Sequence, residues 1–290
     1  LTARLDANQA LEARLEAGMI QASDQTIEQV QADLAGTLED HRLELGVRHP
    51  QAVLDITLAG GWVTEDGGQW SGQLADGQVQ LSEPDQTWQL EAPADLGWRN
   101  QTLTLGAHCW RWQDSTLCAG DQTLLPDTAL DLEISNLPAS ALSPLLPETI
   151  RWKARIDGSL VLSLGGEGPT GDVRVSAGPG EVDVVLDEDW ETLSYRTLTL
   201  SANLTPQQAD VALRLDGDSL GALSVDLTVD PNAPDRPASG TFSLTGFDLA
   251  MGARCSTWRR SAAWWKVPGG WTVPCSPPVW TVSWCSLMAV

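Results

Sequence analysis

The residues with the clearest capacity for chemistry are Cys109 and Cys118, which flank a short polar turn between two apolar segments. Nine positions apart across a predicted hairpin, the two side chains can face each other within disulfide range. A zinc site would need more ligands, and only His108 lies nearby in the sequence. A catalytic thiol would need a separate histidine and acid in a recognisable setting. We therefore predict a structural Cys109–Cys118 disulfide, which implies an oxidising compartment.

No other set of residues has the spacing of an active site. The histidines His41, His49 and His108 are scattered, which is typical of surface or turn positions. The many carboxylates are better explained by a solvated face than by an acid–base pair. Gly178-Pro179-Gly180 lacks the lysine of a phosphate-binding loop. We expect a protein without catalytic residues, metal or cofactor.

The dominant pattern, from Leu43 to Leu249, is an alternation of apolar and polar residues interrupted by Gly- or Pro-bearing turns. A period of two places alternate side chains on opposite faces of a strand. We therefore predict an all-β fold: a long, twisted, mainly antiparallel sheet, curled into an open groove with an apolar lining and an acidic outer face. The residues predicted to line this groove as one continuous face are Leu130, Leu132, Ile134, Val182, Val184, Leu186, Leu198, Leu200, Leu213, Leu215, Val225 and Leu227.

Residues 1–35 combine helix-forming composition with alternation, and we favour strands there. Asp76-Gly77 is one of several predicted turns. The segment 136–147 is too rich in proline for a central strand, and Ser140 is a candidate cap for a short helical turn. Residues 231–237 are expected to form an exposed loop.

Charge excludes some partners. The formal net charge is −22, and phosphate binding needs clustered Lys and Arg, so we expect no nucleic-acid partner. Tryptophan is abundant, with 14 residues against two Phe and one Tyr. The tryptophans before residue 249 fit either packing within the sheet or a sugar- or lipid-binding surface.

The composition changes abruptly after Asp248. Residues 249–290 contain no acid, four basic residues and six tryptophans, and the alternation stops. Prolines and glycines count against a membrane helix, and a Trp-rich binding module is a further alternative. A shifted reading frame fits better. Because tryptophan has a single codon, the codons around each Trp can be re-read in another frame. This re-reading can restore acidic residues and two Arg-Leu-Asp-Gly units. Arg214-Leu215-Asp216-Gly217 is such a unit in the first part of the chain. We predict a groove segment over 1–248 and an out-of-frame, disordered tail over 249–290.

An ordered set of short motifs carries a resemblance. Gly68-Gln69-Trp70-Ser71-Gly72-Gln73-Leu74 precedes Thr87-Trp88-Gln89-Leu90-Glu91-Ala92-Pro93, and the sequences Cys109-Trp110, Leu117-Cys118 and Leu142-Ser143-Pro144-Leu145-Leu146-Pro147 follow. Over about residues 36–248 this order resembles the central region of TamB, the translocation and assembly module subunit of Gram-negative bacteria. Since the chain does not begin with Met, we take it as a fragment of such a protein.

The resemblance implies a non-enzymatic periplasmic protein, anchored in the inner membrane through a segment outside this chain. It implies a role in outer-membrane protein and autotransporter assembly and, through the AsmA-like family, in phospholipid movement between membranes. The implied partners are phospholipid acyl chains and, through a missing C-terminal part, an outer-membrane barrel protein of the BamA/TamA type. The alternatives are a secreted β-solenoid adhesin, which would need a regular repeat, and a β-sandwich carbohydrate-binding module.

Overall fold

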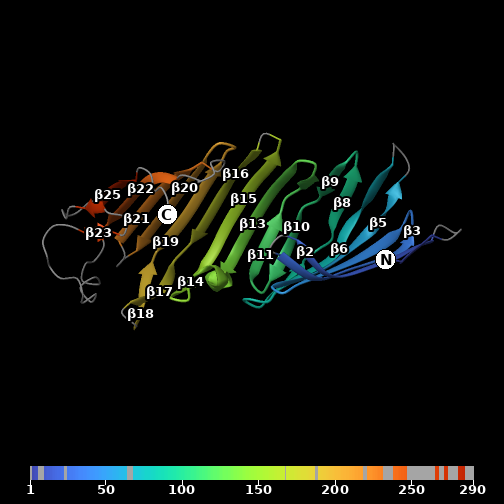
Figure 1. The fold of residues 1–290 in the computed structure, drawn as a ribbon, viewed down its shortest axis with the longest axis horizontal. Helices are drawn as coiled ribbons and strands as arrows, with labels where there is room; N and C mark the ends of the chain where they lie inside the picture. Colours follow the sequence, from blue (N-terminus) through green and yellow to red (C-terminus); the bar gives the residue numbers. More distant parts are fainter. Residues whose placement is uncertain are drawn as a thin grey trace. The chain divides into compact units, whose positions relative to one another are not determined.

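The computed structural model describes residues 2–5, 10–22, 25–63, 68–166, 168–186, 189–217, 221–230 and 238–246, and three short stretches between 265 and 284. Strands make up nearly all of this part of the chain, and every pairing with a defined register is antiparallel (Figure 1). The predicted all-β, antiparallel fold is therefore confirmed.

The chain forms two compact units. The first comprises Leu1–Leu137 with Asp157–Gly171, and the second Pro138–Ile156 with Asp172–Val290. β15 (Arg155–Gly165) and β16 (Gly168–Ala177) are each divided between the units. The other strands of the first unit are β1 (Thr2–Leu5), β2 (Ala10–Ala22), β3 (Gln25–Thr37), β4 (His41–His49), β5 (Ala52–Val63), β6 (Gln69–Leu81), β7 (Gln86–Leu90), β8 (Ala94–Arg99), β9 (Thr102–Leu105), β10 (His108–Trp112), β11 (Ser115–Ala119), β12 (Gln122–Leu125) and β13 (Thr128–Pro138).

Strands β1 to β6 of the first unit form a meander in which each strand pairs with the next. After β6 the sheet is interrupted along one line, here called the crease. β7 and β8 both pair with β6. β10 then pairs with β7, and β9 pairs with β8. Further along, β11 and β12 both pair with β13. The breaks at 91–93, 106–107 and 120–121 therefore lie in register with a bulge in β6 that leaves Ala75 unpaired. A bulge and aligned breaks bend the strands, which curls the sheet.

Beyond β16, the described strands of the second unit fall into three groups. β14 (Ile150–Lys153), β17 (Gly180–Leu186) and β18 (Asp189–Tyr195) form a three-stranded sheet. β19 (Thr197–Leu204), β20 (Ala209–Gly217), β21 (Gly221–Val229), β22 (Ala238–Thr245) and β25 (Trp280–Trp284) form a meander. β23 (Trp265–Val267) pairs with β24 (Trp271–Val273).

Several local predictions can now be compared with the structure. Residues 1–35 contain strands, as expected. The turn at Asp76-Gly77 is wrong, because both residues lie within β6. A 3₁₀-helix, η2 (Ala139–Leu145), occupies the Pro-rich segment, but its N-cap is Pro138 rather than Ser140. The loop at 231–237 and most of the segment 249–290 lie outside the described residues.

Candidate functional site: the apolar face of the sheet

The first unit carries rows of apolar side chains that run across its strands. One row joins β2 to β6 through directly opposed residues: Leu15, Ala32, Leu45, Ile56 and Gly77. A parallel row consists of Ala13, Leu34, Leu43, Leu58 and Leu74, and a third of Ala17, Val30, Val47, Leu54 and Val79. Because alternate residues share a face, the three rows form one continuous apolar surface.

Trp110 extends this surface towards β13. In register it lies between Leu90 of β7 and Leu117 of β11, and Leu117 is opposite Ile134, one of the predicted lining residues. A Cβ atom added to Gly77 would lie 2.5 Å from Cη2 of Trp110. Gly77 therefore provides space for the indole ring, which explains why an Asp-Gly pair occurs inside a strand.

Trp70 is held on the same face by a polar contact. Its indole nitrogen donates a 2.8 Å hydrogen bond to Nε2 of His41, whose Nδ1 lies 3.0 Å from the carbonyl oxygen of Thr37. Since Nε2 accepts, Nδ1 carries the proton in this arrangement. Added Cβ atoms on Gly60 and Gly72 would each approach the Trp70 ring within 2.8 Å. These two glycines leave the space that the ring occupies.

The meander of the second unit has the same two-faced construction. Leu200, Leu213, Val225 and Phe242 are opposed in one row, and Leu198, Leu215, Leu223 and Leu244 in the next. Leu227 lies in a third row, opposite Val211 and Gly240. Six of the twelve predicted lining residues are thus brought together on β19 to β21.

The other predicted lining residues lie elsewhere. Leu130, Leu132 and Ile134 lie on β13 of the first unit. Val182 and Val184 belong to β17 of the three-stranded sheet, where they are opposite Trp152 and Ile150. Leu186 also lies in β17, but its side chain is outside the described residues. Strand pairing places β17 in a separate sheet from β19 to β21, and one continuous face over all twelve residues stays a prediction.

Burial distinguishes this surface from a closed core. Nine hydrophobic side chains are buried among the described residues, and none of the predicted lining residues is one of them. Leu227 is 39% exposed, and the other lining residues whose side chains are described are half-buried. A β-sandwich would bury the apolar side chains of both inner faces. Partial exposure along whole rows is the property of a curled sheet whose apolar face is not fully covered.

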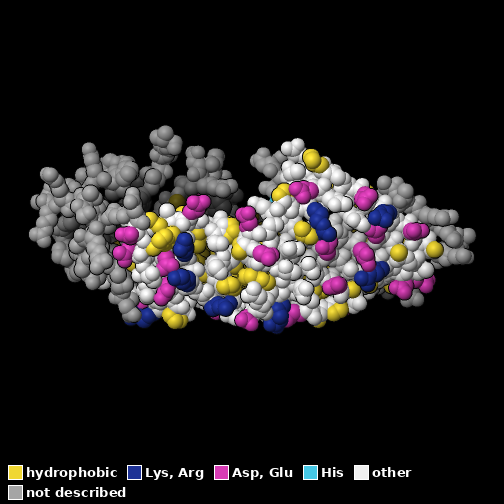
Figure 2. Space-filling view, turned by 90° about the horizontal axis from the view of Figure 1, so that it is seen from below, with side chains coloured by type: hydrophobic (Ala, Val, Ile, Leu, Met, Phe, Trp, Pro, Cys, Tyr) yellow, Lys and Arg dark blue, Asp and Glu magenta, His cyan; other side chains and the backbone are white. Residues whose placement is uncertain are grey.

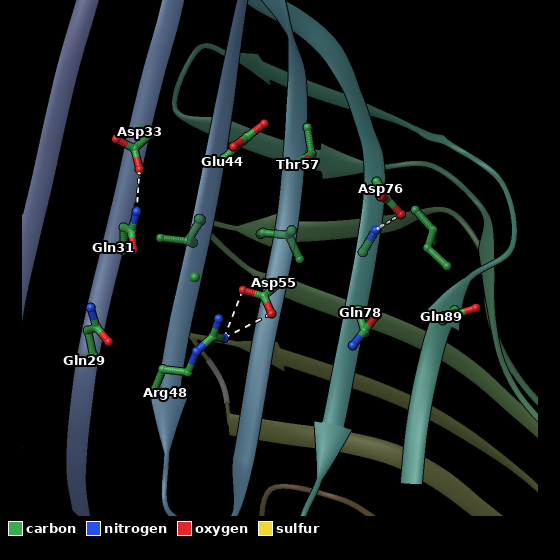
Figure 3. Close-up of a pocket in the computed structure, with 15 residues that line it drawn as sticks. Gln29, Gln31, Asp33, Glu44, Arg48, Asp55, Thr57, Asp76, Gln78 and Gln89 are labelled. Atoms are coloured by element: carbon green, nitrogen blue, oxygen red, sulfur yellow. Dashed lines mark hydrogen bonds and ion pairs between the residues drawn. The ribbon is translucent and has the colours of Figure 1, made fainter.

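The opposite face is polar and is hollowed in both units. In the first unit a hollow of 490 Å³ is lined by Gln29, Asp33, Glu44, Asp55 and other residues of β3 to β7. Figure 3 shows these side chains on one side of the strands, with Arg48 donating two hydrogen bonds to Asp55. Acidic and basic side chains are also interspersed over the face seen in Figure 2. Among the described residues no group of three His, Cys, Asp or Glu could hold a metal ion.

One carboxylate of the three-stranded sheet is almost buried. Asp183 is 7% exposed and accepts hydrogen bonds from Lys153 at 2.8 Å and from the Thr192 hydroxyl at 2.7 Å. These bonds, that of Lys153 first, hold the pKa of Asp183 below its ordinary value. The same hydrogen bond and the charge of Asp183 raise the pKa of Lys153. The pair links β14 to β17 across the three-stranded sheet.

Cys109 and Cys118 are opposite each other in the β10–β11 hairpin, and their sulfur atoms are joined at 2.10 Å. They alternate with Trp110 and Leu117, so the disulfide lies on the polar face. Arg111, between them in sequence, forms an ion pair with Glu91. The disulfide therefore crosslinks the hairpin that presents Trp110 without occupying the apolar surface.

Sequence reasoning missed two features of the site. It did not recognise that Gly60, Gly72 and Gly77 make room for tryptophan rings, although the Trp70-x-Gly72 spacing places ring and glycine on one face. It also treated His41 as a surface or turn residue, whereas its ring accepts the hydrogen bond of Trp70.

A comparison with protein families decides the relationship of this chain. The model of the family described as "TamB, N-terminal domain" matches residues 2–256. The chain belongs to the TamB family. It is therefore a component of the translocation and assembly module type, and TamB proteins are non-enzymatic and span the periplasm. No solved structure matches the chain. Within the described residues no helix is long and apolar enough to cross a membrane.

Proposed function

We propose that the apolar face carries the acyl chains of phospholipids between the inner and outer membranes. On this proposal the chain is part of a protein anchored in the inner membrane. It supports the assembly of outer-membrane proteins and autotransporters, together with an outer-membrane barrel protein of the BamA/TamA type. The observation that carries the proposal is the set of apolar rows across β2 to β6 and β19 to β22, in which most side chains are only half-buried.

The energetics favour an acyl chain on such a surface. Each methylene group removed from water contributes about 0.8 kcal/mol when fully buried. A chain that contacts one apolar wall gains part of this value at each position. Because neighbouring rows contain the same residue types, the free energy changes little as the chain moves from one row to the next. The surface therefore favours retention without a deep binding minimum.

The polar face supports the same function by keeping the sheet in solution. Its carboxylates and guanidinium groups pair across strands, as in Arg48–Asp55 and Arg214–Asp226. Exposed pairs of this kind contribute little stability. Their value is that a hydrated, charged face resists association with other sheets.

The test is to place a charge on the apolar face of the full-length protein. Leu200→Asp or Val225→Asp should block phospholipid passage between membranes, because a carboxylate desolvated without a partner costs several kcal/mol. Asp226→Asn is the matched control, since it changes the neighbouring residue on the opposite face. Passage should be blocked by the first two changes and retained with the third. Unchanged passage in all three variants would contradict the proposal.

A further inference from the structure

Three tryptophans that share a face with apolar side chains donate their indole N–H to an acceptor on the same face. An acyl chain that covered such a ring would strip water from the N–H, which is unfavourable when no acceptor replaces the water. An internal acceptor removes this cost and lets hydrocarbon cover the ring. The pairs are Trp70 with His41 at 2.8 Å, Trp88 with Gln86 at 3.1 Å, and Trp152 with Tyr195 at 2.6 Å.

The three acceptors differ in how they respond to pH. The amide of Gln86 does not titrate, and burial raises the pKa of the Tyr195 hydroxyl above its ordinary value, so this group stays neutral. An imidazole, by contrast, changes its charge between pH 5 and 8. Of the three pairs, that of Trp70 with His41 is therefore the one in which a proton can remove the acceptor.

The hydrogen bonds of His41 require a neutral ring. Its Nε2 accepts from the indole of Trp70, and its Nδ1 donates to the carbonyl oxygen of Thr37 at 3.0 Å. A neutral imidazole has one donor and one acceptor, so it satisfies both partners. An imidazolium ion carries a hydrogen on both nitrogens and cannot accept. Protonation of His41 therefore breaks its bond with Trp70.

The apolar side of β4 offers little to neutralise a charge on His41. Opposite it lie Gly36 of β3 and Gly60 of β5, which have no side chains, and from β6 it contacts Trp70. Within the described residues no carboxylate forms a hydrogen bond or an ion pair with His41. The nearest charged residues along the chain are Glu39 and Asp40 of the exposed β3–β4 turn and Arg42, whose place in β4 turns it to the opposite face.

The Trp70 ring forms part of the surface that an acyl chain would contact. It lies over the backbone of Gly60 and Gly72, since an added Cβ would meet the ring at 2.8 Å and 2.6 Å. The ring thus reaches from β6 across β5 towards His41 in β4. Once its acceptor is lost, a covered indole N–H has no partner, and the ring must turn to water to regain one.

We propose that His41 is a positioning residue of the acyl-chain surface and makes that surface sensitive to pH. The neutral ring holds Trp70 over the two glycines and keeps the face uncharged. The protonated ring releases Trp70 and adds a charge, so the first unit retains acyl chains less well in acid. This inference rests on the proposed function, because it concerns the same apolar face. All three histidines of the chain lie in the first unit, and the second unit therefore provides an internal reference.

The experiment offers the whole chain vesicles of phosphatidylcholine that contain a trace of the same lipid with a photoreactive acyl chain, at pH 7.5 and at pH 5.0. Mass spectrometry counts the lipid adducts on the peptides of β5 and β6 and divides them by those on β20 and β21. We expect this ratio to fall about fivefold in acid, which corresponds to about 1 kcal/mol. Division by the second unit removes effects of pH on the vesicles and on the photochemistry.

Variants at the three histidines assign the effect. His41→Gln keeps an acceptor near the position of Nε2 and does not titrate, so its ratio should stay high at both pH values. His41→Leu removes the acceptor, and its ratio should be low at both. His49→Gln and His108→Gln are the matched controls, because these rings contact the backbone of Gln51 and Gly106 rather than an indole N–H. Both controls should keep the fall seen in the wild type.

A spectroscopic measurement tests the hydrogen bond without any substitution in the pair. In nitrogen-15 NMR the indole signal of Trp70 should shift between pH 7.5 and 5.0, whereas the signals of Trp88 and Trp152 should not. An unchanged Trp70 signal would overturn the inference.

The adduct counts separate the two proposals. A wild-type ratio that does not change with pH, or a fall that persists in His41→Gln, would overturn the role of His41 and leave the acyl-chain function standing. Loss of the fall in His49→Gln or His108→Gln would also overturn it, because the effect would then come from charge elsewhere on the face. Absence of adducts from both units at pH 7.5 would overturn the acyl-chain function itself, and with it this inference.

Discussion

Loss of the Cys109–Cys118 disulfide should destabilise the first unit by an amount that follows from its loop. The two residues are nine positions apart and close a loop of about ten residues. In the chain-entropy model such a crosslink lowers the entropy of the unfolded chain by about 9 cal/mol/K, or about 2.7 kcal/mol at 25 °C. Spread over a unit of this size, that free energy corresponds to a fall in the melting temperature of about 5–10 °C.

The assay compares the oxidised chain with the Cys109→Ser, Cys118→Ser double variant by thermal unfolding. The wild-type chain treated with reductant should have the same melting temperature as the double variant. Reductant should not lower the melting temperature of the double variant further. Because the disulfide lies on the polar face, phospholipid passage should persist at temperatures where the variant is folded. A melting temperature equal to that of the oxidised wild type would refute the reasoning.

Three further predictions concern packing, pH and the end of the sequence. Gly77→Ala should destabilise the first unit by about 1–3 kcal/mol in urea unfolding, because the new Cβ meets the Trp110 ring; Gly165→Ala, which meets nothing within 4 Å, should not. The lowered pKa of Asp183 adds stability above its unfolded value of 3.8, and this is lost as pH falls through the folded value. The melting temperature of Asp183→Asn should therefore vary less between pH 2 and 4 than that of the wild type. Resequencing the DNA should reveal an insertion or deletion near codons 248–258; a clean read in the present frame would sink the frameshift prediction.

The sequence predicted the fold class because its signal is local. Alternation in Leu54-x-Ile56-x-Leu58 sets the two faces of a strand whatever its neighbours are, and these residues do lie on one face of β5. Composition alone left residues 1–35 open between helix and strand. There the alternation of Leu11, Ala13, Leu15 and Ala17 prevailed, since pairing of β2 with both β1 and β3 outweighs helix propensity.

What could not be predicted depends on contacts between distant segments. Asp76-Gly77 has the composition of a turn, and only Trp110, from a strand two positions further across the sheet, gives the glycine a different purpose. The crease is a property of three aligned breaks and the bulge in β6, and each break is an ordinary loop in the sequence. Val182 and Val184 carry the same alternation as Leu198 and Leu200, so nothing local indicated that β17 belongs to another sheet.

The central claim is that this chain distinguishes an apolar, lipid-carrying face from a polar one. It is tested most directly by placing photo-crosslinkers at Leu200, Val225 and Asp226 of the full-length protein in cells and identifying bound phospholipid by mass spectrometry. Val225 and Asp226 are adjacent in β21 and point to opposite faces, so position along the chain is controlled. The account predicts phospholipid adducts at Leu200 and Val225 and none at Asp226. Equal capture at all three positions would contradict it.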